Sequence, residues 1–279
     1  IHSFCQQVLK DFAFESGSPF EMDLIGDDRE LLLSVTDDFW RQNVVQSDSD
    51  FSAYLLARKQ TPESLLQSIR NLVAKPYLQI QALPEVDAEA VTEALNNAFS
   101  HASQCWQKES EQIAAFLHSG GLSKTSYKPE KVERLQALLQ LIFNEQSCPL
   151  AWDELLELAT LEKAESSLKK GTALPELRFW SAMDTLKQRY QDLDTVRALQ
   201  LQQLRLQLLS YIREQLPQQK IQQQVQSYDD LLINLSQALQ GPQGEWLITR
   251  LREQFKAALI DEFQDTDPVQ YDNFRRVFA

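Results

Sequence analysis

Glycine is scarce in this sequence, and several other features of sheet-rich, disulfide-bonded or membrane proteins are missing. Seven glycines occur in 279 residues. Tight hairpins and parallel-sheet crossovers usually need more, so the composition favours helices. The three cysteines stand far apart without a CxxC pair, which indicates reduced thiols in the cytoplasm, and the three histidines lack metal-ligand spacing. No apolar run approaches the roughly 18 residues of a membrane span, and no signal peptide is present, so we expect a cytoplasmic protein without membrane contact.

Positive charge is also in short supply. The formal net charge is −13 and the isoelectric point is about 4.8. A free-standing nucleic-acid binder usually carries a basic stripe, because neutralising phosphates supplies much of its affinity. We therefore expect this chain not to grip DNA strongly by itself, although local contacts within a larger assembly fit its charge. Lys169, Lys170 and the lysines of residues 124–131 are its candidates for phosphate contact.

Helical spacing of apolar residues dominates the rest of the sequence. Thr61-Pro62-Glu63 is typical of a helix start, and Asp27 or Asp28 is placed to cap a helix. We expect Pro149 and Pro217 to interrupt helices, and residues 119–129 and 169–175 to be loops. The pattern predicts helices over 1–12, 31–42, 62–75, 86–118, 130–144, 177–216, 228–239 and 246–256, and a last helix beginning at Asp267-Pro268.

Residues 257–260 differ from this pattern. They form a short apolar run, AALI, that ends in Asp261 and Glu262. We predict a buried strand there that delivers the two acids at its carboxyl end. A buried strand needs neighbours, and the sequence supplies none convincingly. The chain, which starts at Ile1 rather than methionine, is therefore expected to be a segment cut from a longer protein.

A strand ending in Asp-Glu is the Walker B arrangement of ATPases. The first carboxylate lies near Mg²⁺, which prefers oxygen ligands, and the second can accept a proton from the water that attacks the γ-phosphate. Two adjacent acidic residues alone are more often found in solvent at the start of a helix than in an ATPase site. The whole run from strand to DEFQDTDPVQY favours the ATPase interpretation.

Residues 261–270, DEFQDTDPVQ, resemble motif II of the UvrD/RecB group of superfamily 1 helicases, whose hallmark begins DE-x-QD-T. Residues 1–6, IHSFCQ, are similar to the group's T-I/F-H-S/G-F-C-Q motif without its threonine. Residues 227–232, SYDDLL, are similar to its F-D-D-M/L-L segment, and residues 14–17, FESG, resemble RecB-type members. The segments occur in the family's order, whereas residues 50–189 are assigned by position alone.

The resemblance implies a mainly α fold: a helical insertion subdomain of the 1B type with short flanking pieces of a RecA-like α/β motor domain. The ends of the chain should then lie close together, because an insertion leaves and re-enters its host at neighbouring points. The implied divisions are residues 1–15 (motor domain 1A), 16–225 (insertion) and 226–279 (return to 1A with motif II).

The resemblance also implies site residues and partners. Asp261 matches the acid beside Mg²⁺, Glu262 the catalytic base, and Gln264 the glutamine that senses the γ-phosphate of ATP. His2 and Ser3 match residues that contact single-stranded DNA. The intact protein would use ATP and Mg²⁺ to unwind DNA in double-strand-break repair and recombination. It would be the RecB-like subunit of an exodeoxyribonuclease V complex, with RecC-like and RecD-like subunits, and its helical insert could meet duplex DNA.

The loop that holds ATP's phosphates, GxxxxGK(S/T), is absent from the sequence. Residues 120–125, GGLSKT, are only a partial likeness, because Ser123 precedes the lysine and a helix rather than a strand comes before. We therefore expect the chain alone to be inactive. Two alternatives stay open: a helical protein–protein interaction module whose acid motif is coincidental, and a fragment of another UvrD- or AddA-like helicase.

Other candidate residues have simpler interpretations. His101 and His118 are expected on helix surfaces, and the five tryptophans are expected to pack in cores rather than stack on bases. Asp229 and Asp230 resemble a pair of metal ligands, but the residues at the matching positions of the family have a structural role. We expect the same structural role here.

Overall fold

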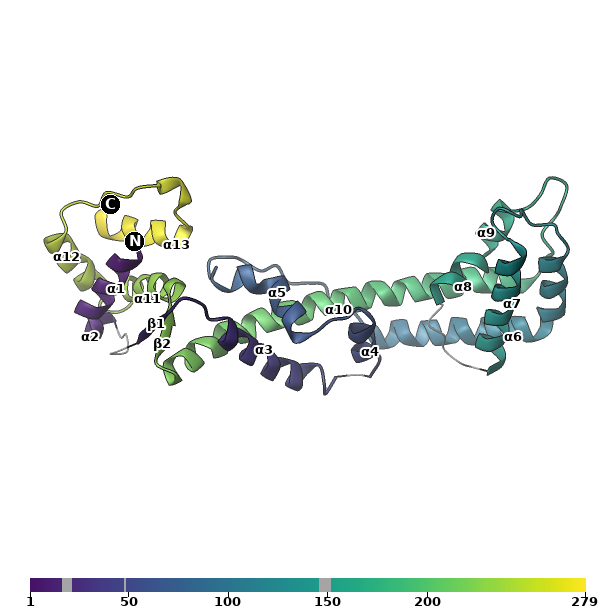
Figure 1. The fold of residues 1–279 in the computed structure, drawn as a ribbon, viewed down its shortest axis with the longest axis horizontal. Coiled ribbons are helices and arrows are strands. Elements are labelled where there is room, and N and C mark those ends of the chain that lie inside the picture. The colour runs from purple at the N-terminus through teal and green to yellow at the C-terminus, as the bar shows by residue number, and fades with distance from the viewer. Residues whose placement is uncertain (17–21, 48, 146–151) are drawn as a thin grey trace. The chain divides into compact units, whose positions relative to one another are not determined.

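The structure is a computed structural model that describes residues 1–16, 22–47, 49–145 and 152–279. Its mainly helical chain divides into two compact units (Figure 1). Unit 1 combines Ile1–Leu83 with Leu201–Ala279, and unit 2 is Pro84–Gln200. None of the helices in the described ranges is long and apolar enough to cross a membrane. The mainly α class predicted from the sequence is confirmed.

Unit 2 is a helical body around an aromatic core. Phe179 and Trp180 are fully buried there, and Trp106 and Phe143 pack beside Phe179. The carboxylate of Glu109 accepts hydrogen bonds from the N–H groups of Arg178 and Phe179, at 3.2 and 2.9 Å, and so caps the helix that they begin. The helices of this unit are α6 (Ala88–His118), α7 (Pro129–Glu145), α8 (Trp152–Leu158), α9 (Leu161–Ser166) and the first part of α10 (Arg178–Gln222).

Unit 1 contains two apolar cores. The first lies among α3 (Arg29–Asn43), α4 (Ser49–Ala57), α5 (Pro62–Val73) and the later part of α10. Leu65, Leu208 and Ile212 are fully buried in it. The predicted start of α5 is confirmed: the Thr61 side chain accepts from the Ser64 N–H, and the Ser64 hydroxyl accepts from the Thr61 N–H.

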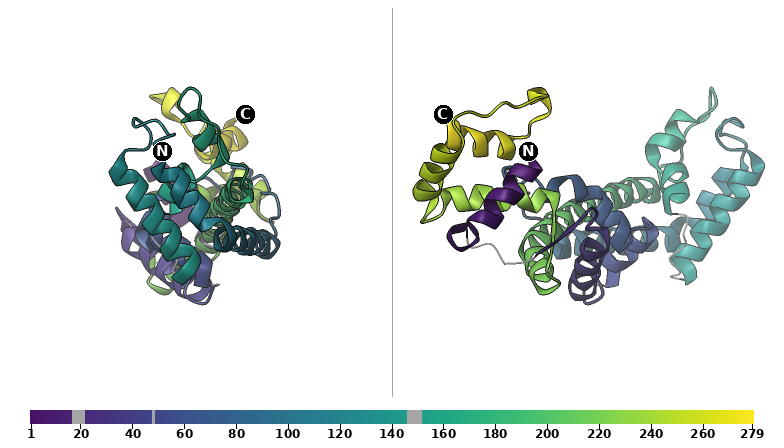
Figure 2. Two further views of the ribbon diagram at one scale, coloured as in Figure 1. Left: turned by 90° about the vertical axis from the view of Figure 1, so that its right-hand side faces the viewer. Right: turned by 60° about the vertical axis from the view of Figure 1, so that its left-hand side comes forward.

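The second core of unit 1 joins the two ends of the chain. It is built by α1 (His2–Asp11), α11 (Tyr228–Gln240), α12 (Gly244–Gln254) and α13 (Pro268–Phe278), and α2 (Ala13–Ser16) packs against α11. Phe4 of α1 stacks on Phe274 of α13 with ring centroids 5.5 Å apart. The first and last helices lie together in both figures (Figures 1 and 2). The expectation that the ends meet is confirmed.

A two-stranded parallel sheet lies between these cores. β1 (Asp23–Ile25) pairs with β2 (Val225–Ser227), Leu24 opposite Gln226. Successive side chains of a strand point to opposite faces. Accordingly, Leu24 packs with the core of the chain ends, and Ile25 packs with the core of α3, α5 and α10. The sequence predicted neither strand, since each is too short for an alternating pattern to be recognised.

Two predictions about elements were wrong. Pro217 does not interrupt a helix, because α10 continues through it to Gln222. A proline costs a helix one hydrogen bond, and here the buried side chains of Leu216 and Lys220 hold the chain on either side of it. Residues 257–260 are not a buried strand: they have no regular structure, and Leu259 is fully exposed. An apolar run becomes a strand only beside a partner strand, and among the residues that the structure describes β1 and β2 pair only with each other. The predicted break at Pro149 lies outside the described residues.

Candidate functional site

The predicted acid motif forms a tight, solvent-facing turn. Glu262 has φ 51° and ψ 46°, the left-handed region that non-glycine residues rarely adopt. Its N–H donates to Asp261 Oδ1 at 3.0 Å, and its side chain accepts a hydrogen bond from Gln264 Nε2. A short 3-10 helix, Phe263–Asp265, follows. The turn therefore places the candidate base and the candidate sensor in direct contact.

The acids of this turn are free to meet a cation. Asp261, Glu262 and Asp265 are exposed. Across the described ranges, no lysine or arginine forms an ion pair with any of them. Nor does the described part of the chain contain a group of three or more His, Cys, Asp or Glu arranged to hold a metal ion. Mg²⁺ is commonly bound through one or two carboxylates together with waters and substrate phosphates. The oxygens of Asp261 fit that kind of shared coordination.

Packing on both sides of the turn fixes its ends. The Phe4 ring contacts Phe274, after the motif, and also Phe255, before it, with centroids 5.4 Å apart. Asp267 caps α13 by accepting from the Gln270 N–H at 2.8 Å, as the Asp-Pro pair predicted. Asn273 Nδ2 donates to the Leu232 carbonyl at 3.0 Å and ties α13 to α11. The anchors of motif II are thus the first helix of the chain and α11.

The candidate DNA-contacting residues lie on that same first helix. His2 is half-buried and Ser3 is exposed at the start of α1. The His2 ring meets the Tyr228 ring edge-on, with centroids 5.4 Å apart. Tyr228 begins α11 in the segment that resembles F-D-D-M/L-L. Two motifs that lie far apart in the sequence therefore meet here, in keeping with the expected closeness of the chain ends.

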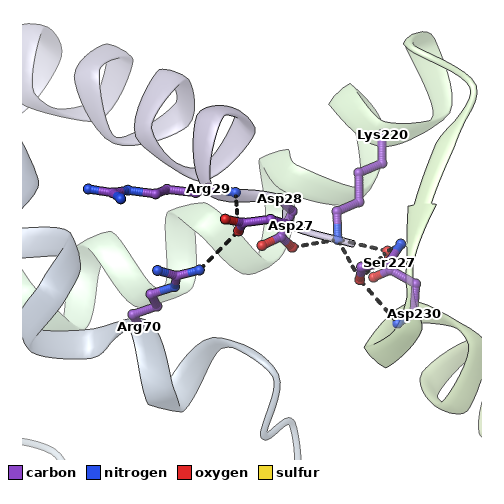
Figure 3. Close-up of polar contacts among 7 residues, drawn as sticks. All are labelled: Asp27, Asp28, Arg29, Arg70, Lys220, Ser227 and Asp230. Carbon is purple, nitrogen blue, oxygen red and sulfur yellow. Dashed lines mark hydrogen bonds and ion pairs between the residues drawn. The ribbon is translucent and has the colours of Figure 1, made fainter. Parts of the chain in front are cut away.

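A buried lysine that the sequence did not single out lies behind this meeting point. Lys220, in the last turn of α10, is 4% exposed. Its Nζ lies 2.9 Å from Asp28 Oδ2, 2.7 Å from Asp230 Oδ2 and 3.1 Å from Ser227 Oγ (Figure 3). The only signal in the sequence is the repeated Asp-Asp pair after each short strand, at 27–28 and 229–230. Asp230 proves structural, as expected.

Asp229 faces the neighbouring cleft. This cleft, of about 320 Å³, is lined by residues that include Asp27, Asp28, Arg70, Tyr228 and Asp229. Burial raises the pKa of Asp229, and the nearby Asp230 and Asp28 raise it further, while Lys220 and His2 lower it. The carboxylate is thus held in an environment that favours its protonated form.

Two lysine-bearing loops of unit 2 lie side by side, although about forty residues separate them in sequence. Leu122 and Leu168 form an antiparallel bridge, and the Lys169 N–H donates to the Gly121 carbonyl at 3.0 Å. This pairing brings the two basic clusters of the sequence together. Their exposed lysines are Lys124, Lys128, Lys131, Lys169 and Lys170.

Comparison with known proteins agrees with the motifs. The whole chain, residues 1–279, matches the UvrD/REP helicase N-terminal domain family. It is 29% identical over 287 residues to the RecBCD enzyme subunit RecB of Escherichia coli, covering 100% of this chain and 23% of the relative. The RecB subunit of Haemophilus influenzae is 28% identical over 309 residues, with 100% and 25% covered. That of Mycobacterium tuberculosis is 37% identical over 76 residues, 27% of this chain and 7% of the relative. The chain spans about a quarter of the length of the first two relatives.

Proposed function

The chain belongs to the UvrD/REP helicase N-terminal domain family, and on this basis we propose that it is the part of a RecB-like DNA helicase subunit that carries the ATPase acid motif. The observation that carries the proposal is the turn at residues 261–264, where the two acids and the glutamine of motif II meet. The match over the whole chain argues against the alternative of a coincidental acid motif. The whole protein would act in double-strand-break repair and recombination.

In the proposed reaction, each motif residue has its own task. ATP with Mg²⁺ supplies the phosphoanhydride bond whose hydrolysis drives movement along DNA. Asp261 offers a carboxylate oxygen on the metal side. Glu262 accepts the proton of the attacking water, a role that contributes about 10²- to 10⁴-fold to the rate once the substrate is positioned. Gln264, hydrogen-bonded to Glu262, reports the state of the γ-phosphate to the rest of the domain.

The same proposal assigns each part of the chain to a subdomain of the helicase. Residues 1–15 and 226–279 belong to the RecA-like motor domain 1A, and residues 16–225 form the helical 1B-like insertion. The shared core of α1, α11 and α13 supports this assignment, because the motor pieces from both ends of the sequence pack together. The phosphate-binding loop and the remaining sheet would come from other parts of the intact protein.

DNA is the proposed macromolecular substrate. His2 and Ser3 would contact single-stranded DNA at the motor. The paired loops of unit 2 are our candidate for contact with duplex DNA, since their lysines are exposed in an otherwise acidic chain. RecC-like and RecD-like subunits are the proposed protein partners. A cytoplasmic location and a nuclease activity elsewhere in the intact subunit stay predictions.

The experiment is a strand-separation assay with the full-length protein and its partner subunits on a blunt duplex. The proposal predicts ATP-dependent unwinding that Asp261→Asn and Gln264→Ala each reduce at least tenfold, while Asp153→Asn, an exposed acid on α8, has no effect. Unwinding that is unaffected by changes at Asp261 and Gln264 would contradict the assignment of motif II.

A further inference from the structure

We propose that Lys220 is a positioning residue for the DNA contact at His2, acting through the start of α11. The inference rests on the proposed function, because it takes His2 as a DNA-contacting residue. It goes further by naming a buried residue, from a different helix, that controls the contact. Lys220 itself faces carboxylates rather than solvent, so it would not touch DNA.

The ammonium group of Lys220 holds two distant parts of the chain. Asp28 is the residue directly before α3, at the end of the short segment that follows β1, and Asp230 lies in the first turn of α11, after β2. Both carboxylates lie within 2.9 Å of Nζ, and both side chains are less than a third exposed. One cation therefore compensates two partly buried anions (Figure 3). Removing one partner of such a cluster leaves uncompensated charge, which is strongly unfavourable.

Asp230 connects this cluster to the helix start. Its Oδ2 accepts from the Ser227 N–H at 2.7 Å, and the Ser227 hydroxyl caps α11 by accepting from the Asp230 N–H. Lys220 Nζ reaches both members of this capping box. The lysine thus fixes the direction in which α11 begins.

Tyr228 carries that constraint to His2. It is the first residue of α11, directly after the capping serine, and its ring contacts the His2 ring. Tyr228 is 47% exposed and borders the 320 Å³ cleft, so apolar packing holds it weakly. The polar cluster behind it is then the main restraint on its position. Without Lys220, repulsion between Asp28 and Asp230 would loosen the helix start and shift the ring against which His2 rests.

The test uses the full-length protein with its partner subunits and follows ATP hydrolysis as a function of single-stranded oligothymidylate concentration. Lys220→Met should raise the DNA concentration for half-maximal stimulation roughly tenfold, equivalent to about 1.4 kcal/mol. The kcat at saturating DNA should stay within a factor of two. Lys220→Arg should recover most of the affinity, because it keeps the charge. Lys75→Met, which removes an exposed lysine of the same unit, should match the wild type.

The outcomes separate this inference from the proposed function. If the wild type is stimulated by DNA and Lys220→Met lowers kcat or thermal stability with unchanged half-saturation, the lysine is merely structural and the inference fails. If the wild type shows no stimulation at all, the proposed function fails. Should Lys220→Met not fold, Asp230→Asn provides the second variant, because it weakens the contact between Lys220 and the start of α11. It should weaken DNA binding in the same direction, and an unchanged half-saturation there would equally overturn the inference.

Discussion

Asp229, in the segment that resembles F-D-D-M/L-L, is a residue whose ionised carboxylate lowers the stability of the fold. Its pKa is raised chiefly by burial, and then by the negative charges of Asp230 and Asp28. The folded state therefore binds its proton more tightly than the unfolded state does. Such a group stabilises the fold below the ordinary aspartate pKa of about 3.9, and this contribution is lost as the pH rises through the raised value.

This dependence of stability on pH leads to a prediction for the variant Asp229→Asn. At pH 7 the variant should melt at a higher temperature than the wild type, because the amide removes the cost of a partly desolvated negative charge beside Asp230 and Asp28. The difference should shrink as the pH falls, because the wild-type carboxyl takes up its proton at a higher pH than an ordinary aspartate does. Thermal melts at pH 7, 5 and 4 would check this, with Asp23→Asn, at an exposed strand residue, as the control. A gain that grows on acidification would contradict the assigned pKa shift.

Burial suppresses the chemical reactivity of the Cys5 thiol. It is 1% exposed, and burial is the main cause that raises its pKa to about 11. The reactive thiolate is therefore rare at neutral pH. We predict that iodoacetamide at pH 8 leaves Cys5 unmodified in the folded protein and alkylates it in urea, as read by peptide mass spectrometry. Rapid alkylation of folded protein would mean that α1 is not packed as described.

At the scale of elements, local chemistry was predictable and distant packing was not. The starts of α5 and α13 followed from Thr61-Pro62 and Asp267-Pro268, because a cap is made by neighbouring residues. The passage of α10 through Pro217 was missed, since it depends on side chains such as Lys220, whose ion pair with Asp28 joins residues far apart in the sequence. Residues 257–260 were mispredicted for the same reason, because a strand is stabilised by its neighbours and not by its own sequence.

The start of α10 offers an element-scale prediction. Glu109 of α6 accepts hydrogen bonds from two N–H groups in the first turn of this helix, where a negative charge is also favourable. We expect Glu109→Gln to lower the free energy of unfolding by about 0.5–2 kcal/mol, the range for losing a helix cap. Urea unfolding followed by fluorescence of Trp106 and Trp180 would measure it. The control is Glu111→Gln on the exposed surface of α6, and equal effects of the two changes would contradict the capping role.

At the scale of the whole molecule, the motifs predicted the joining of the chain ends, and the structure confirms it. The division at residues 84 and 200 was not visible in the sequence. Helical periodicity continues without a break where α10 passes from one compact unit to the other. The charge of −13 suggested weak DNA binding by the chain alone, and the paired lysine loops are a local exception to that negative charge.

A prediction at this scale concerns the isolated chain. It should not hydrolyse ATP at a measurable rate, although it contains Asp261 and Glu262, because the loop that positions the phosphates is absent from its sequence. A coupled-enzyme assay on purified chain, with and without single-stranded DNA, would check this. Steady turnover that Glu262→Gln abolishes would show that the chain binds ATP in a way we have not recognised.

The assignment of Glu262 as the catalytic base is tested most directly by Glu262→Gln in the full-length protein, with ATP hydrolysis and nucleotide binding measured on the same preparation. The amide keeps the shape of the side chain and cannot accept the proton. We therefore predict a loss of about 10²- to 10⁴-fold in the hydrolysis rate, with the affinity for a fluorescent ATP analogue unchanged within a few-fold. Hydrolysis at the wild-type rate would contradict the account.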